Sequence, residues 1–494
     1  MANTTKIAVL TLVFALAACA EPNRAPKVTL ERAEAEIVYP GHADSSPHIA
    51  EADVRSRIAA LADDRFEGRL PGTVAGEASA DWIAAEMQRI GLKPGNGGSY
   101  FQDVAAASTT LDPTQSKFEI ETPSGTIAPK FADDVAYWTP RFDNAEQAVS
   151  DSELVFVGYG VDAPEHKWND FASVDVKGKT IVVLINDPGF VTRDDTLFKG
   201  RAMTYYGRWT YKFEEAARKG AAAVIIVHET EPASYGWQVV RNSNTGDKLY
   251  LDSPNGNADR VTVQSWVTED TAKKLFAAAG LDYAALRIAA NKRGFKAVPM
   301  TGLKLNARTV SKVQRFKTRN ILGLVPGRRA ADEAVILTAH WDHLGIKPNV
   351  PGDDKLHNGA VDNASGVAAI LEIGEAFARA KRKPRRSVLV AAVTLEEQGL
   401  LGSEYLAAHP PMPLNRIVAG VNIDAMLPVG RSRSMGVVGS GASELEPILA
   451  GVLREQGRGM QPDSTPERGS FYRSDHISFA KLGVPMLYAG GSED

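Results

Sequence analysis

The sequence predicts an α/β fold in which a mainly parallel mixed sheet is flanked by helices and a second, β-rich domain is inserted into the chain. Apolar, β-rich runs alternate with helix-like segments from about residue 304 to the end, as in parallel strands joined by helices. The 494 residues exceed the usual size of one domain, so we expect two. The segment 134–297 has strands of its own and is too long for a loop, so we expect it to fold independently.

These patterns divide the chain into segments with different expected roles. A signal peptide is expected over 1–18, and a tether rich in Pro, Ala, Glu and Ser over 19–50. The main domain is expected over 51–133 and 298–494, with the inserted domain 134–297 between its two parts.

The composition is that of an ordinary soluble globular protein. The hydrophobic fraction is 44% and the charged fraction 23%, with a net charge of −4. No extended basic block suggests binding to nucleic acid, so we expect no nucleic-acid partner.

The N-terminus predicts export and a lipid anchor. Lys6 precedes the apolar run Ile7–Ala18, which is short for a membrane span and ends directly before Cys19, the single cysteine. This pattern resembles a bacterial lipoprotein signal, in which the cysteine is lipidated and becomes the mature N-terminus; the alternative is an ordinary secretory signal with an incidental cysteine. We therefore expect a protein of the bacterial cell envelope, anchored to a membrane surface. Ala20 after Cys19 favours the outer membrane facing the periplasm, with the cell surface as the alternative.

Histidines and carboxylates occur at the ends of the predicted strands in the main domain. His340 and Asp342 follow the apolar run 334–339, and Glu396 and Glu397 follow the run 386–394. The further members of this set are Asp362, Asp424 and His476. The carboxyl ends of strands in an open α/β sheet are where ligands bind. Imidazole and carboxylate together suit zinc, whereas calcium and magnesium prefer oxygen ligands.

Spacing suggests different roles for the members of this set. His340 and Asp342 are two residues apart and face the same side of an extended strand. We therefore expect His340 to bind the metal and Asp342 to support it as a neighbour. His343 is then expected to point away, as a packing or substrate-side residue. Adjacent Glu396 and Glu397 diverge, so one can bind metal while the other acts as general base.

The remaining members complete two half-sites. Asp362 lies where a helix begins and is either an N-cap or the carboxylate that bridges two cations. Asp424 and His476 each supply one further candidate ligand. Two zinc ions would activate a water molecule and polarise a carbonyl. Tyr472 is a candidate donor to the resulting oxyanion.

The motifs TAHWDHLG, NGAVDNASG, LEEQGLLGS, NIDAM and RSDHISF resemble, in order and spacing, the metal-site segments of the family-28 zinc aminopeptidases. The segment 134–297 resembles the protease-associated domain that interrupts some members, and Arg65–Thr73 resembles their N-terminal segment. The resemblance covers nearly everything after Ala50. It implies a zinc-exopeptidase-like fold for the main domain.

The resemblance also implies a role for each site residue. His340 and Asp424 would hold one zinc ion, Glu397 and His476 the other, and Asp362 would bridge both. Glu396 would be the general base, Asp342 would orient His340, and the peptide bond after Asp362 is a candidate cis bond. The family generally continues past its final strand through a histidine-containing loop into a terminal helix, so this sequence departs from the family there, and whether it is truncated is not predicted.

The expected function is a di-zinc metallo-exopeptidase, an aminopeptidase that removes N-terminal residues from peptides. Alternatives on the same fold are a carboxypeptidase, a dipeptidase or a single-zinc glutaminyl cyclase, and retention of the five ligands and Glu396 argues against the cyclase. A further alternative is a non-catalytic binding module. Peptide substrates and a membrane surface are the expected partners, while the oligomeric state is not predicted.

Overall fold

Four parallel strands form the centre of the sheet that carries the predicted site residues. In spatial order they are β17 (Arg386–Val393), β14 (Ala330–His340), β18 (Ile417–Asn422) and β21 (Met486–Gly491). The computed structural model describes residues 45–347, 352–428 and 430–491, all within one compact unit. The predicted signal peptide, Cys19 and most of the predicted tether lie outside these residues.

Antiparallel strands extend this sheet on both sides. Beyond β17 lies β13, which pairs with β2 and with the short β1, and β2 in turn pairs with β11. Beyond β21 lie β19 and β20. The bounds of these strands are β1 (Lys93–Pro94), β2 (Phe101–Leu111), β11 (Lys248–Leu251), β13 (Val298–Val325), β19 (Ser434–Val437) and β20 (Gly459–Gln461).

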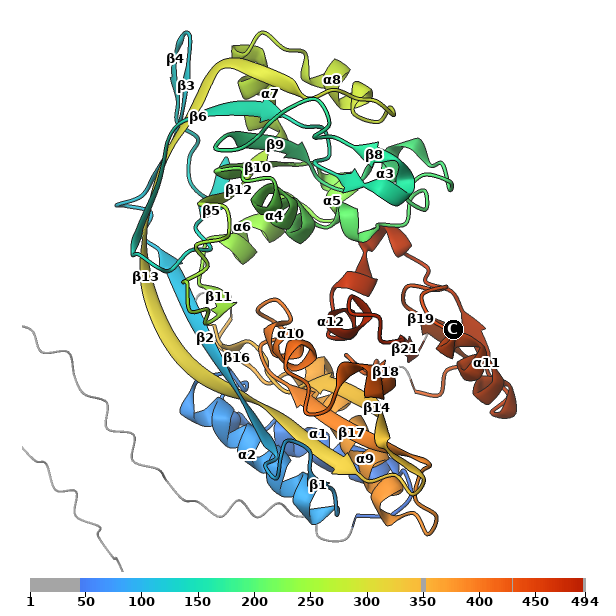
Figure 1. The fold of residues 1–494 in the computed structure, drawn as a ribbon. Coiled ribbons are helices and arrows are strands. Elements are labelled where there is room, and N and C mark those ends of the chain that lie inside the picture. The colour runs from blue at the N-terminus through green and yellow to red at the C-terminus, as the bar shows by residue number, and fades with distance from the viewer. Residues whose placement is uncertain (1–44, 348–351, 429, 492–494) are drawn as a thin grey trace, which may run out of the picture. The chain divides into compact units, whose positions relative to one another are not determined.

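Helices cover both faces of the four parallel strands, as Figure 1 shows: α1, α2 and α9 lie on one face, and α10 and α12 on the other. Seven of the eight residues of β17 are buried, because a strand covered on both faces needs apolar side chains on both. These helices and the exposed α11 are α1 (Glu51–Leu61), α2 (Val74–Arg89), α9 (Ser365–Arg379), α10 (Leu401–Ala408), α11 (Leu445–Glu455) and α12 (His476–Ala480).

A second sheet is formed mainly by the predicted inserted segment. Strands β6, β9, β10 and β12 are parallel neighbours, and β5 is antiparallel to β12. Hairpin β3–β4 joins the sheet through β13. The bounds are β3 (Lys117–Thr122), β4 (Gly125–Ile127), β5 (Val135–Trp138), β6 (Glu146–Phe156), β9 (Thr180–Leu184), β10 (Ala223–His228) and β12 (Val263–Thr268).

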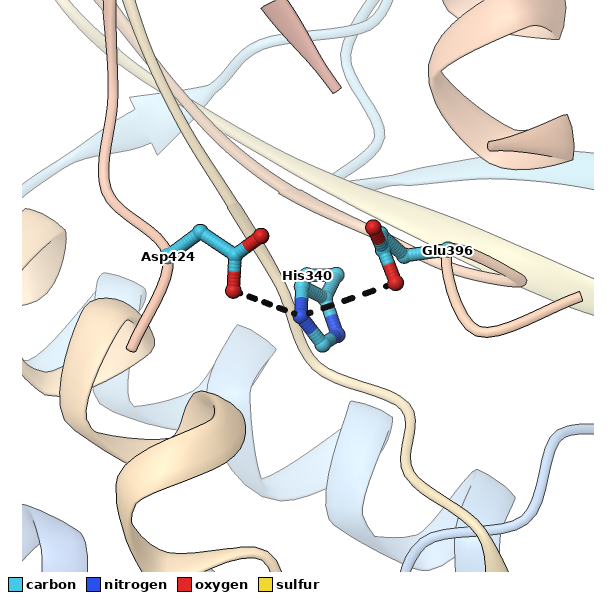
Figure 2. A group of neighbouring side chains, drawn as sticks. All are labelled: His340, Glu396 and Asp424. Carbon is cyan, nitrogen blue, oxygen red and sulfur yellow. Dashed lines mark hydrogen bonds and ion pairs between the residues drawn. The ribbon is translucent and has the colours of Figure 1, made fainter. Parts of the chain in front are cut away.

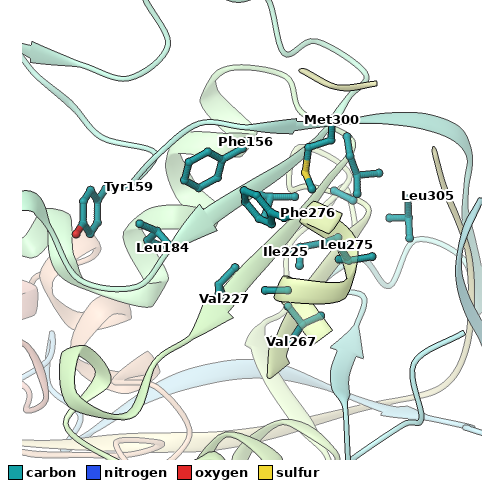
Figure 3. Close-up of a cluster of buried hydrophobic side chains, with 14 of the residues drawn as sticks. Phe156, Tyr159, Leu184, Ile225, Val227, Val267, Leu275, Phe276, Met300 and Leu305 are labelled. Atoms are coloured by element: carbon teal, nitrogen blue, oxygen red, sulfur yellow. The ribbon is translucent and has the colours of Figure 1, made fainter. Parts of the chain in front are cut away.

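Helices and two apolar clusters accompany the second sheet. Figure 3 shows part of one cluster, where Phe156, Phe276 and Met300 pack against β10 and β12. Gly220, with a φ of +74°, follows the end of helix α4. The helices of this region are α3 (Pro188–Thr192), α4 (Trp209–Arg218), α5 (Thr230–Ala233), α6 (Trp237–Asn244), α7 (Glu269–Ala278) and α8 (Tyr283–Ala289).

Strand β13 belongs to both sheets (Figure 1). Its first part pairs with β3 and β6, and its second part with β2 and β17. Val310 pairs with Glu146 of β6, and the next residue, Ser311, pairs with Leu111 of β2. The sequence predicted strands here, but one continuous strand through both sheets was not predicted. The boundaries proposed for the inserted domain stay a prediction.

The region before residue 91 consists of two helices separated by a loop. Helix α1 ends at Leu61, a loop follows, and α2 begins after Thr73, whose side chain accepts a hydrogen bond from Gly76 N. Gly91, with a φ of +89°, ends this helical region. Among the described residues, no helix has the length and apolar character that crossing a membrane requires.

A buried charge network connects α1, α2 and α9. The guanidinium of Arg57 forms ion pairs with Glu86, 2.9 Å away, and with Glu372 and Glu375. Ser45 and Ala50, at the end of the predicted tether, donate to Glu375 and Glu372 over 2.7 Å each. Buried ions are stable only when they are paired and hydrogen-bonded, so one arginine satisfies carboxylates from two helices.

Replacing Arg57 is expected to destabilise the protein far more than replacing a surface arginine of the same helix. The Arg57 side chain is 0% exposed and its loss leaves the buried carboxylate of Glu372 without a cation, so Arg57→Ala should cost about 3–5 kcal/mol. Arg55, 78% exposed and paired with Glu51, is the matched control, for which Arg55→Ala should cost about 0.5 kcal/mol or less. Urea unfolding measures both. Equal losses would contradict the buried network.

Candidate metal centre

The first group of metal-competent side chains surrounds His340 at the carboxyl end of β14. The Nε2 atom of His340 lies 3.2 Å from Asp424 Oδ1 and 3.9 Å from Glu396 Oε2 (Figure 2). Asp424 follows β18, and Glu396 follows β17. Because β14 is a parallel neighbour of both strands, their carboxyl ends meet at one edge and bring the three side chains together.

The second group consists of His343, Asp362 and Glu397, with ligand atoms within 4.8 Å of one another. The Nδ1 atom of His343 lies 2.7 Å from Glu397 Oε1. The expectation that His343 points away from the site was therefore wrong. It assumed that strand alternation continues past His340, whereas β14 ends there and residues 341–344 form an irregular loop.

Asp362 lies between the two groups. Its Oδ1 atom is 3.1 Å from His340 Nε2 of the first group, while it also belongs to the second group. The peptide bond between Asp362 and Asn363 is cis, as the resemblance implied. The side chain of Asn363 accepts a hydrogen bond from Gly366 N at the start of α9, so Asp362 is not needed as a helix cap.

Asp342 supports the site through both its backbone and its side chain. The Nδ1 atom of His340 is 3.0 Å from the main-chain oxygen of Asp342, and this contact orients the ring so that Nε2 faces the carboxylates. The side chain of Asp342 accepts a hydrogen bond of 3.1 Å from the backbone N of Glu396. Asp342 thus fixes the positions of two site residues.

A chain of hydrogen bonds behind the first group was not predicted from the sequence. Thr338 donates to Asn422, Asn422 donates to Ser474, and Ser474 donates to Asp424 Oδ2 over 2.6 Å. These residues come from β14, from β18 and from the loop before α12. The sequence offered only a weak signal, namely that polar residues interrupt apolar runs just before the predicted ligands.

Arg69 also supports the candidate metal centre and was not predicted as a site residue. Its guanidinium is buried and donates to the carbonyl oxygens of Trp341 and Gly359, over 2.7 and 2.8 Å. Burial lowers the pKa of Arg69 to about 10, and the carboxylates of Asp342 and Asp362 act to raise it. The segment Arg65–Thr73, noted in the sequence only by resemblance, thus ties the loops on either side of the second group together.

The carboxylates strongly influence the ionisation of the site. Burial acts to lower the pKa of His340, but Glu396, Asp362 and Asp424 outweigh it and hold this pKa well above its usual value. Burial raises the pKa of Glu396 well above its usual value, and neighbouring carboxylates raise it further. Burial likewise raises the pKa of Asp342 to about 6. A bound cation would relieve this accumulation of negative charge.

His476 and Tyr472, like the supporting residue Asp342, are predicted site residues that belong to neither group of described residues. His476 is fully buried against Phe471 and Tyr488, and among the described residues neither ring nitrogen has a hydrogen-bond partner. Burial lowers the pKa of His476 to about 4, which favours the neutral imidazole that binds metal. Tyr472 packs against Tyr205, with ring centroids 5.8 Å apart.

The donor set fits zinc. It combines imidazole nitrogens with carboxylate oxygens, which zinc accepts at short distance. The buried nitrogens of His476 without hydrogen-bond partners and the repelling carboxylates of Glu396 and Asp424 would each gain from a cation. Two adjacent groups, linked by Asp362, offer positions for two ions.

Comparison with known proteins agrees with this donor set. Residues 320–493, which include both groups, match the model of peptidase family M28. A probable glutamate carboxypeptidase of Arabidopsis thaliana is 26% identical over 193 residues, covering 38% of this chain and 25% of that protein. A probable zinc metalloprotease of Leptosphaeria maculans is 34% identical over 93 residues, covering 18% of this chain and 20% of that protein. The chain thus spans a quarter or less of the length of these curated relatives.

Solved structures with a similar course of the chain include two bacterial enzymes. An aminopeptidase from Aneurinibacillus sp. strain AM-1 has a TM-score of 0.49 at 18% identity, covering 90% of this chain and 86% of that chain. A zinc aminopeptidase from Bacillus subtilis has a TM-score of 0.40 at 18% identity, covering 91% and 86%.

His476, and not His343, is expected to be required for full metal content. The nitrogens of its buried imidazole have no hydrogen-bond partner among the described residues, whereas His343 already contacts Glu397. After dialysis against zinc, plasma mass spectrometry should find two zinc ions per chain in the wild type and in His343→Ala, and about one in His476→Ala. Loss of zinc from His343→Ala alone would instead assign the second site to His343, Asp362 and Glu397.

Proposed function

We propose that the protein is a di-zinc metallo-exopeptidase, and specifically an aminopeptidase that hydrolyses N-terminal residues from peptides. One observation carries this proposal: two groups of imidazole and carboxylate donors lie side by side at the carboxyl ends of parallel strands, connected by Asp362. The match of residues 320–493 to a peptidase family model supports peptide hydrolysis as the reaction class.

The proposed ligands are His340 and Asp424 for one ion, Glu397 and His476 for the other, and Asp362 for both. The position of Asp362, 3.1 Å from His340 and grouped with Glu397, supports the bridging role. Two zinc ions in these positions would lower the pKa of the attacking water and polarise the scissile carbonyl. The chain's own contribution is to hold the donors in place through Asp342, Arg69 and Ser474.

Glu396 is the proposed general base. Its Oε2 atom lies 3.9 Å from His340 Nε2, farther than the carboxylates of Asp362 and Asp424 at 3.1 and 3.2 Å. This spacing supports a position just outside the ligands, where Glu396 can take a proton from the attacking water and deliver it to the leaving amine. The hydrogen bond from the backbone N of Glu396 to the side chain of Asp342 fixes the backbone of Glu396.

Replacing Glu396 tests this assignment. Glu396→Ala should lower kcat on aminoacyl-nitroanilides by about 100-fold or more, because a positioned base contributes about 10²–10⁴-fold. Zinc content should stay at two per chain, since Glu396 is not a proposed ligand. Glu455→Ala, an exposed position on α11, serves as control. Wild-type activity in Glu396→Ala would overturn the base assignment, and loss of zinc would make Glu396 a ligand.

Carboxypeptidase and dipeptidase activity are the alternatives on the same site. Part of the chain is similar to a probable glutamate carboxypeptidase, and this similarity is the reason to test carboxypeptidase activity. Hydrolysis of a peptide with an acetylated N-terminus distinguishes these activities, because an aminopeptidase needs the free amine and a carboxypeptidase does not. A folded protein that binds no zinc would support the non-catalytic binding module instead.

The proposed location is the bacterial cell envelope, through a lipid on Cys19. The basis is the sequence Lys6 to Cys19, which lies outside the described residues. Cys19→Ser should abolish incorporation of labelled palmitate in a bacterial host and leave the protein with an uncleaved or alternatively cleaved N-terminus. Unchanged labelling in Cys19→Ser would refute the lipid anchor. Ala18→Gly, which keeps a small residue before the cysteine, is the matched control.

A further inference from the structure

Two turns rich in arginine and lysine lie side by side at one edge of the main sheet. One turn joins β13 to β14, and the other joins α9 to β17. Arg328 N donates to the carbonyl oxygen of Pro384 over 2.9 Å. Arg329 N donates to the carbonyl oxygen of Arg385 over 3.2 Å. These hydrogen bonds hold the two turns against each other, so their charged side chains share one surface.

Seven cationic side chains are exposed on these two turns and on the nearby β1. We call them the basic face, and they are Lys93, Arg328, Arg329, Lys381, Arg382, Lys383 and Arg385. The ion pairs of this region use other cations, in the pairs Arg379–Glu375, Arg386–Glu333 and Arg416–Asp332. Within the described part of the chain, no carboxylate forms an ion pair with any of the seven. The positive charge of the basic face is therefore not compensated by the protein itself.

A hollow between the turns brings three of these charges together. Its volume is about 330 Å³, and Lys93, Arg328 and Lys383 line it. The other described residues that line it are glycine, proline, valine and alanine, and none is acidic. The Nζ atom of Lys383 donates to the carbonyl oxygen of Ala378, and an ammonium group has two further N–H groups to donate. The hollow therefore suits an oxyanion such as a phosphate group.

The chain enters the main domain beside the basic face. Ser45 is the first described residue, and its hydroxyl donates to Glu375 over 2.7 Å. Its carbonyl oxygen accepts a hydrogen bond from Arg379 Nη1 over 3.2 Å. Arg379 is the last residue of α9 and directly precedes the turn that carries Lys381. The preceding part of the chain, in which a lipid anchor is predicted at Cys19, is thus joined to the domain at this side.

The metal centre lies at the opposite edge of the same sheet. Strand β14 begins at Ala330, next to the basic face, and ends at His340. Its parallel neighbour β17 begins at Arg386 and is followed by Glu396. At a rise of about 3.3 Å per residue, β14 alone extends over about 30 Å. A surface bound by the basic face would therefore leave the metal centre facing away from it.

The charge of the whole chain makes this local cluster informative. The net charge is −4, so an anionic surface would repel the protein at long range. The basic face reverses the sign of the charge on one side only. Clusters of about four to eight lysines and arginines near a membrane attachment point are typical of segments that bind anionic lipids. The position of the basic face beside the predicted anchor thus favours a membrane over nucleic acid as its partner.

We propose that the basic face docks on the phosphate headgroups of an anionic phospholipid membrane and holds the metal centre on the side that faces away from the lipid. The hollow between Lys93, Arg328 and Lys383 receives one headgroup phosphate, and the other four cations contact neighbouring headgroups. A lipid on Cys19 would bring the protein to the membrane, and the basic face would set its orientation there. The inference does not depend on the proposed peptidase activity.

Co-sedimentation with vesicles tests the docking on a chain that begins at Ala20. This chain contains all of the compact unit that begins at Gly41 and lacks Cys19, so no lipid contributes to binding. Vesicles of phosphatidylcholine are compared with vesicles of phosphatidylcholine and phosphatidylglycerol in equal parts. At low salt, binding to the anionic vesicles should be at least about tenfold tighter, and added salt should reduce this preference. Equal binding to both kinds of vesicle would overturn the proposal.

Removal of charge assigns the binding to the basic face. The triple variant Lys381→Gln, Arg382→Gln and Lys383→Gln changes three exposed side chains on one turn, which folding should tolerate. It should bind anionic vesicles at least about tenfold more weakly than the parent chain. The double variant Arg328→Gln and Arg329→Gln, on the other turn, should also bind more weakly. Thermal unfolding checks that each variant is folded.

A matched control separates the basic face from net charge. The triple variant Lys274→Gln, Lys292→Gln and Lys296→Gln removes three exposed lysines of the inserted segment, and its net charge changes by the same amount. It should bind anionic vesicles like the parent chain. Equal weakening in the two triple variants would show that binding follows net charge alone, and the docking face would be refuted.

Two labelled positions test the orientation. The chain from Ala20 contains no cysteine, so Ala331→Cys and Ile346→Cys each introduce a single attachment site for a fluorophore. Ala331 is exposed beside the basic face, and Ile346 is exposed three residues after His343 of the second metal group. Energy transfer to rhodamine-labelled lipid in anionic vesicles should be stronger from position 331 than from position 346. Equal or reversed transfer would contradict the proposed orientation.

Other anions are distinguished by two competitors. A short DNA duplex that binds the chain more tightly than the anionic vesicles do would assign the basic face to nucleic acid. Inorganic phosphate that displaces the chain from the vesicles at constant ionic strength would assign the hollow to a free anion. Either result would overturn docking on a membrane, whereas vesicle binding that persists against both competitors supports it.

Discussion

The accumulation of carboxylates around His340 is the constraint on which the metal centre depends. Asp362, Glu396 and Asp424 all approach one imidazole nitrogen, within 3.1 to 3.9 Å. Like charges at these distances are tolerated only with a cation or shared protons between them. Parallel strands β17, β14 and β18 impose this proximity, because each ends at the same edge of the sheet.

Much of the fold and part of the site could be predicted from the sequence, for identifiable reasons. The apolar runs before His340, Glu396 and Asp424 are strands, and they are apolar because both of their faces are covered. The order of these runs was enough to predict that their ends converge. Asp362 was predicted as the connecting residue, and the structure places it against both groups.

Other features could not be predicted because they depend on where a strand stops or on distant partners. His343 contacts Glu397 only because β14 ends at His340, and periodicity does not specify a strand end to one residue. Arg57 looks like an ordinary arginine in the sequence. Its three carboxylate partners lie on two other helices, and these contacts arise only in the tertiary structure.

Strand β13 has a consequence for how this chain can change. Because side chains alternate along a strand, one added or deleted residue turns all later side chains to the opposite face. In β13 the pairing passes from β6 to β2 between Val310 and Ser311, with no intervening loop to absorb such a shift. A single-residue insertion near this point would therefore exchange inward and outward side chains in one sheet relative to the other. Length variation during evolution should thus be confined to the loops, while the number of residues in β13 stays constant.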